Sequence, residues 1–226
     1  MTFDIITIFP DSISAYLKES ILGRAQAKKL IKINLHDIRK YSKDKHRKVD
    51  DRPYGGGPGM VMTLQPLLSC FNNAVRNISR RGGKEASEII VFRASGKQFD
   101  DKAAGLLAKR RKNIILICGH YEGIDGRLIK IIKDMGWRVS ELSIGPYVLT
   151  GGEIPAMAAV DAVSRKIKGV LGKEESLEEK RYGVGTKVFT RPEEFKWRGK
   201  KYKVPKDLVS GNHRLIEKWR LEHREK

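Results

Sequence analysis

The chain has 226 residues, an apolar fraction of 40% and two cysteines, which allow one substantial hydrophobic core with a small appended module and argue against a disordered or disulfide-rich protein. Its 46 lysines and arginines outnumber 27 acids and give a formal charge of +19, well beyond the magnitude of about 2–8 that is usual for a small soluble domain. This balance indicates a polyanion-binding protein with nucleic acid as its partner, while the alternative is that the lysines serve solubility alone.

No apolar stretch approaches the roughly 20 residues that a membrane span requires. The N-terminus has neither the basic start nor the small-residue cleavage site of a secretory signal, so we expect a cytoplasmic protein without a membrane partner. Neither Cys70 nor Cys118 has a histidine or a second cysteine at zinc-ligand spacing. The sequence therefore predicts no metal site of this kind and two buried thiols.

Taken in chain order, the sequence alternates between strand-like and helix-like patterns. The expected strands cover residues 3–9, 31–38, 89–92, 113–118 and 137–144. The expected helices cover 10–29, with Ser12 or Ser14 as the cap, 63–79, entered by Pro66, 100–111, 124–135 and 153–167. This alternation is typical of an α/β fold with parallel strands. The helix over 153–167 is broadly apolar, which indicates burial on more than one side, with another subunit as one candidate neighbour.

The composition changes after Gly172. Residues 173–191 are polar and lack helical or strand periodicity, so we interpret them as an interdomain linker. Residues 192–226 are strongly basic, carry Trp197, Tyr202 and Trp219, and end in a helix-like segment from 212 to 226. The expected organisation is a main domain over 1–172, a linker and a small basic domain.

Glycine-rich segments recur where three of the expected strands end, at 94–97, 118–126 and 143–153. In open α/β sheets the carboxyl ends of the strands border the ligand crevice. Glycines there let backbone groups approach a ligand and contact an adenine or ribose edge. Each segment alone is more often a plain turn, but together they predict a shared small-molecule pocket. None matches a dinucleotide-binding or nucleoside-triphosphate motif.

A fourth glycine-rich segment, residues 50–60, differs in kind. It contains Asp50 and Asp51 and closes a long loop with a run of cations, namely Arg39, Lys40, Lys43, Lys45, Arg47 and Lys48. A basic loop beside a glycine-proline hinge suits a lid over an RNA base, while the alternative is a solvated charged loop.

Four segments together carry a resemblance to a known family. They are 52–60 (RPYGGGPGM), 118–125 (CGHYEGID), 143–153 (SIGPYVLTGGE) and 208–213 (LVSGNH). In this order the chain resembles the bacterial tRNA (guanosine-37-N1)-methyltransferases, members of the trefoil-knotted SPOUT class, over nearly its whole length.

The resemblance implies a knotted α/β domain over 1–172 that wraps S-adenosylmethionine, a helical tRNA-binding domain over 192–226, and a homodimer with its active site at the interface. The expected cofactor-binding residues are Phe92, Arg93, Gly119, Gly123, Ile144, Gly145, Pro146, Tyr147, Val148, Leu149, Gly151, Gly152 and Pro155. The expected substrate-binding residues are Asp50, Arg52, Pro58, Gly59, Asn212 and His213. The resemblance also suggests that Mg²⁺ assists catalysis.

Guanine N1 carries a proton and is a poor nucleophile, so its methylation requires a base and a group that supports charge on O6. The resemblance assigns the base to an acid in the linker and the supporting role to Arg165, whose alternatives are a helix cap or a phosphate contact. It also implies that Glu122 binds the hydrogen-bond-donor edge of guanine. The alternative is that Glu122 is a solvated carboxylate in a turn. His120 needs no catalytic role and is expected at a turn or on the surface.

The chain departs from the family pattern at two places. An ungapped match from Gly172 places Lys180 at the position of the linker acid, and a shift of one residue places Glu179 there. We take Glu179 as the base and Glu178 as the second candidate, while an acidic helix start is the structural alternative. Pro146 stands where the family usually has aspartate, and proline has no N–H to offer a cofactor.

Two other functions remain open at this point. The charge and the C-terminal aromatic residues also fit a non-enzymatic RNA-binding or ribosome-associated protein. The third hypothesis is a knotted methyltransferase that modifies another RNA site.

Overall fold

The computed structural model describes residues 1–171 and 187–223. By its contacts the chain divides into two compact units, Met1–Val170 and Leu171–Lys226. Among the described residues, no helix is long and apolar enough to cross a membrane.

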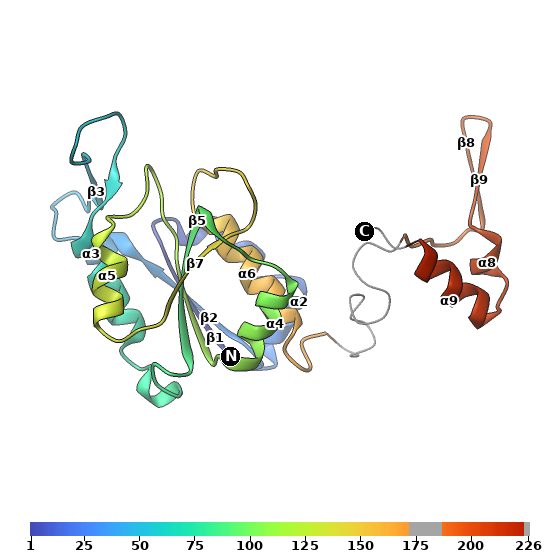
Figure 1. Ribbon diagram of the computed structural model, residues 1–226, viewed down its shortest axis with the longest axis horizontal. Coiled ribbons are helices and arrows are strands. Elements are labelled where there is room, and N and C mark those ends of the chain that lie inside the picture. The colour runs from blue at the N-terminus through green and yellow to red at the C-terminus, as the bar shows by residue number, and fades with distance from the viewer. Residues whose placement is uncertain (172–186, 224–226) are drawn as a thin grey trace. The chain divides into compact units, whose positions relative to one another are not determined.

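A five-stranded parallel sheet forms the centre of the first unit (Figure 1). The strands are β1 (Thr2–Thr7), β2 (Lys32–Asp37), β5 (Ser87–Gln98), β6 (Asn113–Ile117) and β7 (Val139–Ser143). Their order is β2-β1-β6-β5-β7, so β5 lies between β6 and β7. The predicted α/β fold with a parallel sheet is confirmed, because each expected strand has a counterpart in this sheet.

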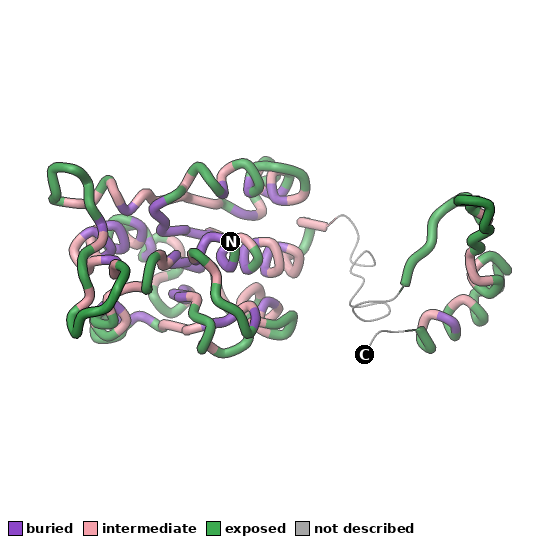
Figure 2. The backbone as a smooth tube through the Cα atoms, turned by 90° about the horizontal axis from the view of Figure 1, so that it is seen from above, coloured by how far each residue is buried: buried purple, intermediate pink, exposed green. Residues whose placement is uncertain are grey.

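Helices cover both faces of the sheet, as Figure 1 shows. One face carries α1 (Pro10–Lys18), α2 (Ser20–Ala27), α4 (Asp101–Arg110) and α6 (Glu153–Arg165), and the other carries α3 (Leu64–Val75) and α5 (Arg127–Asp134). Alternate residues of the strands feed the two hydrophobic layers: Phe3 and Ile5 pack with the first set, and Ile6 packs with the second. Figure 2 shows the buried residues gathered in the interior of this unit and the exposed residues along its outer loops.

The predicted helix over 10–29 is two helices. Glu19 is extended, with ψ of 163°, and Ser20 has a φ of +49°, so the chain turns between α1 and α2. The capping prediction is also wrong. α1 begins at Pro10 without a side-chain cap, because proline at the first position needs no N–H partner, and Ser12 Oγ instead donates to the Phe9 carbonyl at 2.7 Å.

The segment 94–97 is not a turn but part of β5. Pairing between β5 and β7 shifts register between Phe92 and Lys97, as in a β-bulge. A Cβ on Gly96 would lie 2.6 Å from the Leu142 carbonyl carbon, so glycine is required there for the approach of a neighbouring strand.

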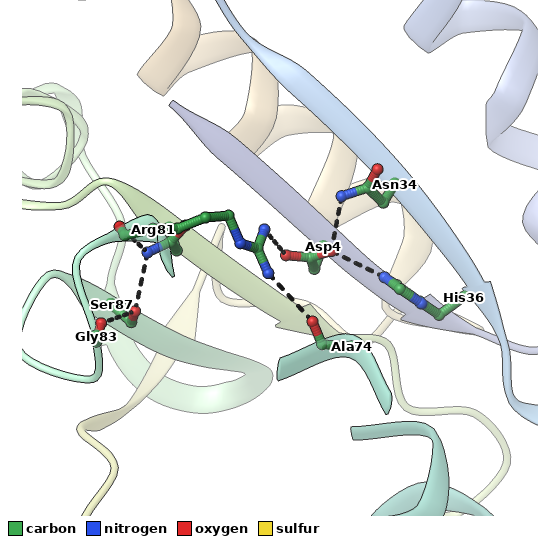
Figure 3. A network of polar contacts seen from close by, with 8 residues as sticks. Asp4, Asn34, His36, Ala74, Arg81, Gly83 and Ser87 are labelled. Carbon is green, nitrogen blue, oxygen red and sulfur yellow. Dashed lines mark hydrogen bonds and ion pairs between the residues drawn. The ribbon is translucent and has the colours of Figure 1, made fainter. Parts of the chain in front are cut away.

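The amino ends of the strands enclose a buried polar network (Figure 3). Asp4, 1% exposed, accepts hydrogen bonds from Asn34 at 2.8 Å and Arg81 at 2.8 Å and lies 2.9 Å from His36 Nε2. Burial would raise the pKa of the Asp4 carboxyl, but the hydrogen bonds from these three side chains and the Arg81 charge outweigh it and hold that pKa below its ordinary value.

The described part of the second unit contains a hairpin and two helices. They are β8 (Glu194–Trp197), β9 (Lys200–Lys203), α8 (Lys206–Val209) and α9 (His213–Glu222). Trp219, 7% exposed, contacts the Phe189 ring and stacks on His223. The expected C-terminal helix is present as α9, but the hairpin was not predicted, so the description of this unit as purely helical is incomplete.

Candidate functional site

A cavity of about 490 Å³ lies at the carboxyl ends of β5, β6 and β7. All three glycine-bearing segments border it, so the expected meeting of the three strand ends in one hollow is found. The lining comprises Val91–Ser95, Gly119–Ile124, Leu142–Gly145, Tyr147–Gly152 and Pro155.

Backbone contacts tie the second and third segments together. Gly152 N donates to the Gly119 carbonyl at 2.9 Å, and His120 forms an isolated β-bridge with Gly151. Since β5 separates β6 from β7 in the sheet, residues 144–152 must cross the end of β5 to reach β6. A Cβ on Gly152 would lie 2.6 Å from Cys118 Cα, so this crossing depends on the absence of a side chain.

Twelve of the thirteen expected cofactor-binding residues line the cavity. The exception is Pro146, which lies outside the lining. Within the third segment, the Ser143 hydroxyl donates to the Gly145 carbonyl at 2.8 Å, and the Tyr147 hydroxyl donates to the Ile144 carbonyl at 3.3 Å. These internal bonds hold the segment in a loop at the cavity wall.

The sequence analysis did not predict a buried acid, Glu153, which adjoins Gly152 of the cavity lining. Glu153, 8% exposed, accepts a hydrogen bond from Thr7 Oγ1 at 2.5 Å, and its other oxygen lies 2.6 Å from His120 Nε2. His120 also packs edge-on against Phe9. The prediction that His120 is a turn or surface residue is therefore incomplete, because its ring is half-buried between Phe9, which follows β1, and Glu153 of α6. The available signal was an acid opening an otherwise apolar helix.

The base of the basic loop contacts the second segment. Glu122 N donates to the Met60 carbonyl at 3.0 Å, and a Cβ on Gly59 would lie 2.6 Å from Glu122 Oε1. Asp50 pairs with Met62 in the short hairpin of β3 (Asp50–Asp51) and β4 (Val61–Met62). Glu122, which lines the cavity, thus lies beside Gly59, and Arg52 and Pro58 are exposed farther along the loop.

Arg165 does not line this cavity. It ends α6, ten residues beyond Pro155, which is about 15 Å along a helix axis. Glu178, Glu179 and Lys180 lie outside the described residues. In the second unit, the Asn212 side chain caps α9 by accepting from Arg214 N at 3.0 Å, and His213 is exposed at the start of that helix.

The described residues also bear on metal ligands and on the two cysteines. No group of three or more His, Cys, Asp or Glu residues capable of holding a metal ion occurs in the described parts of the chain. Both cysteines are buried, as predicted, and burial raises the pKa of the Cys118 thiol and brings that of Cys70 to about 12. Neither thiol is therefore suited to act as a nucleophile near neutral pH.

A parallel α/β sheet with a glycine-bordered cavity at its carboxyl edge is the arrangement typical of open α/β proteins that bind small molecules. Comparison with known proteins gives the particular family. The family model described as tRNA (guanine-1)-methyltransferase TrmD matches residues 1–226, and the chain belongs to this family. The resemblance drawn from the four sequence segments is thereby confirmed.

Several relatives are similar over nearly the whole chain. A protein of Alkaliphilus oremlandii (strain OhILAs) is 45% identical over 224 residues, covering 97% of this chain and 86% of the relative. A protein of Clostridioides difficile (strain 630) is 42% identical, with coverage of 98% and 91%, and one of Dictyoglomus turgidum is 45% identical, with coverage of 97% and 83%. All three are named tRNA (guanine-N(1)-)-methyltransferase.

Proposed function

We propose that this protein transfers a methyl group from S-adenosylmethionine to N1 of the guanine at position 37 of tRNA, in the cytoplasm. Family membership over the full chain carries the proposal. The cavity between the three strand ends supports it, and the formal charge of +19 suits a tRNA substrate.

The cavity fits the methyl donor in size and chemistry. Its volume of about 490 Å³ falls within the range of small-molecule sites, and its walls include Ile144, Gly145 and Tyr147–Leu149 of the third segment and the apolar residue Ile124. A bound donor supplies an electrophilic methyl group. The chain's own task is to hold guanine N1 in line with that group and to remove its proton.

Glu122 is the group at the cavity suited to guanine. Its carboxylate accepts hydrogen bonds only, which complements the N–H groups on the Watson–Crick edge of guanine. We propose Asp50, Arg52, Pro58 and Gly59 of the adjacent loop as further contacts to the RNA, since this loop meets the cavity at Glu122.

The remaining catalytic roles belong to Arg165 and Glu179, with Glu178 as the second candidate for the base. Within one chain, Arg165 lies at the far end of α6 from the cavity. We therefore propose a homodimer in which the end of α6 and the linker of one copy complete the cavity of the other. The broad apolar surface of α6 and the 55% exposure of Ile154 suit such an interface.

The crossing of 144–152 over β5 is the local arrangement that a trefoil knot needs, and we propose that residues 1–172 form a knotted methyltransferase domain. Residues 173–191 then serve as a linker and 192–226 as the tRNA-binding domain, with Asn212 and His213 near the RNA. The Asn212 side chain already caps α9, so it would act there by fixing the helix start. A requirement for Mg²⁺ remains part of the proposal, and loss of methyl transfer on chelation would support it.

Radiolabelled methyl transfer to tRNA transcripts tests the function. A transcript with guanine at position 37 should be methylated, and one with adenine there should not. Binding of tRNA without uptake of S-adenosylmethionine in calorimetry would instead favour a non-enzymatic RNA-binding protein, and methylation at another nucleotide would favour a different site specificity.

Substitution of the linker acid tests the mechanism. Glu179→Gln should lower methyl transfer by about 10²- to 10⁴-fold, as loss of a general base does, while S-adenosylmethionine affinity changes little. Glu178→Gln is the matched control, and the assignment is wrong if that variant is the inactive one. Arg165→Ala should also lower turnover, and a normal rate would return Arg165 to a structural role.

A further inference from the structure

The hairpin of β8 and β9 presents an unusual surface. Phe195, Trp197 and Tyr202 are 54%, 57% and 54% exposed. In Figure 1 the two strands project away from α8 and α9, and Figure 2 shows this part of the unit as exposed. Aromatic side chains normally enter a core, as Trp219 does in the same unit, so three exposed rings on one short hairpin call for a binding partner.

The register of the hairpin places these rings on one face. Phe195 pairs with Tyr202, and Trp197 pairs with Lys200. Because successive strand residues point to opposite faces, Phe195, Trp197, Tyr202 and Lys200 share one side of the ribbon. We call this side the aromatic face.

The opposite face of the hairpin is polar, and part of its positive charge is neutralised by an acid. It carries Glu194 with Lys196, Lys201 and Lys203. Glu194 lies 3.2 Å from Lys201 Nζ and 3.3 Å from Lys203 Nζ. The acid that compensates the lysines is thus on the polar face, away from the rings.

The two strands are joined by a two-residue turn, which places the Arg198 guanidinium beside Trp197. Arg198 and Gly199 both have positive φ, +47° and +74°, as in a two-residue type I′ turn. The Arg198 guanidinium lies 5.9 Å from the Trp197 ring centre. Residues 193–203 carry five lysines and arginines against two acids, so the aromatic face is set in positive charge.

We infer that the aromatic face of this hairpin stacks on unpaired bases of the tRNA substrate. Rings surrounded by cations bind single-stranded nucleic acid, because the bases stack on the rings and the phosphates pair with the cations. Bases within an A-form stem are covered by their neighbours, and proteins therefore take bases from loops and ends. The inference rests on the proposed function and names the part of the RNA that the second unit contacts.

The tryptophans provide a direct readout. Trp197 is 57% exposed, whereas Trp137 and Trp219 are 7% exposed, and these are the three tryptophans of the chain. Titration with a tRNA stem–loop should quench the emission of the full chain. A blunt duplex of the same stem should quench it much less, because it offers no unpaired bases.

Three variants separate stacking from other causes. Trp197→Phe should lose most of the quenching but keep the dissociation constant, measured by filter binding, within about threefold. Trp197→Val keeps strand propensity but removes the ring and should weaken stem–loop binding by about tenfold. Trp137→Phe, which changes a buried tryptophan of the first unit, should retain the quenching.

Three results would overturn the inference. The first is equal quenching by stem–loop and duplex, which means contact through phosphates alone. The second is Trp197→Val with unchanged affinity. The third is Trp197 emission in the free protein that acrylamide does not quench, which means that the aromatic face is already covered by protein. Methyl transfer to the guanine-37 transcript by the unaltered chain tests the proposed function separately, so either idea can fail alone.

Discussion

The buried carboxylates at the two ends of the central sheet have different partners, and a residue of β1 belongs to each of the two networks. At the amino end, Asp4 is buried against the Arg81 guanidinium with Asn34 and His36 as further partners. At the carboxyl end, Thr7 donates to Glu153, whose second oxygen faces His120. The two side chains leave β1 on opposite faces, toward η2 (Ser79–Arg81) and toward α6.

The two ends also differ in how the chain packs around these carboxylates. At the amino end the Arg81 guanidinium directly compensates the Asp4 carboxylate, whose side chain is 2% exposed (Figure 3). At the carboxyl end, glycines replace side chains where the backbone segments cross, and a cavity of about 490 Å³ remains. We therefore expect substitutions at the amino end to change stability and substitutions at the carboxyl end to change ligand binding.

Gly152→Ala should produce the largest effect on binding. The φ of Gly152 is −83°, which alanine adopts without strain, but its Cβ would lie 2.6 Å from Cys118 Cα and 2.9 Å from Gly119 N. Both contacts are backbone and cannot move as a flexible side chain does. The crossing segment must shift, and we expect S-adenosylmethionine affinity in calorimetry to fall by at least about 10²-fold.

Gly126→Ala is the matched control, since a Cβ there meets nothing within 4 Å and the residue lies outside the cavity lining. It should bind the methyl donor normally. Circular dichroism and thermal unfolding of both variants complete the comparison. If Gly152→Ala unfolds the protein, the crossing supports stability as well, and the division between the two ends is wrong.

The sequence predicted the centre of the sheet well because β1, β6 and the first half of β5 contain β-branched, apolar runs. Residues 113–117, for example, are buried throughout. The prediction of helix boundaries was wrong where a single backbone angle determines the boundary. The break at Ser20 depends on a positive φ at a serine, and nothing in the local pattern demands it.

The candidate site was predictable only where local sequence patterns define it. Glycine segments at strand ends indicate a crevice whatever ligand it takes, whereas the pairing of Glu153 with Thr7 joins residues 146 positions apart and needs the fold to be known. The β8–β9 hairpin was a missed signal, because Phe195, Trp197 and Tyr202 alternate with lysines on either side of Arg198–Gly199, a pattern typical of a hairpin.

Asp4→Asn tests the amino end. The variant leaves the Arg81 guanidinium, whose side chain is 25% exposed, without its counter-charge, and we expect a loss of about 3 kcal/mol in the free energy of unfolding at pH 7, at the low end for a buried ion pair. S-adenosylmethionine affinity should stay within about twofold. Urea unfolding and calorimetry on the same samples measure both quantities, and the reverse pattern would refute the division.

The pH dependence of that loss has a definite sign. The folded-state pKa of Asp4 is lowered, so its contribution is fully present above the ordinary value of about 3.9 and disappears as pH falls through the folded-state pKa. The stability difference between the unaltered protein and Asp4→Asn should therefore shrink below about pH 4. A difference that is constant down to pH 2 would mean that the carboxylate charge is not its source.

Thr7→Val should give the smallest effect of the three, although Thr7 is as buried as Asp4. Valine has nearly the same shape, and the change removes a neutral hydroxyl that donates to Glu153 and accepts from Phe9 N at 2.9 Å. We expect a loss of about 1 kcal/mol in unfolding free energy, because Glu153 keeps His120 as a partner. A double-mutant cycle with Glu153→Met isolates the Thr7–Glu153 contact, because methionine keeps the length of the side chain but removes the oxygen that accepts from Thr7. Additive losses would show that the hydroxyl stabilises β1 through Phe9 alone, in which case Thr7 belongs to the strand rather than to the cavity.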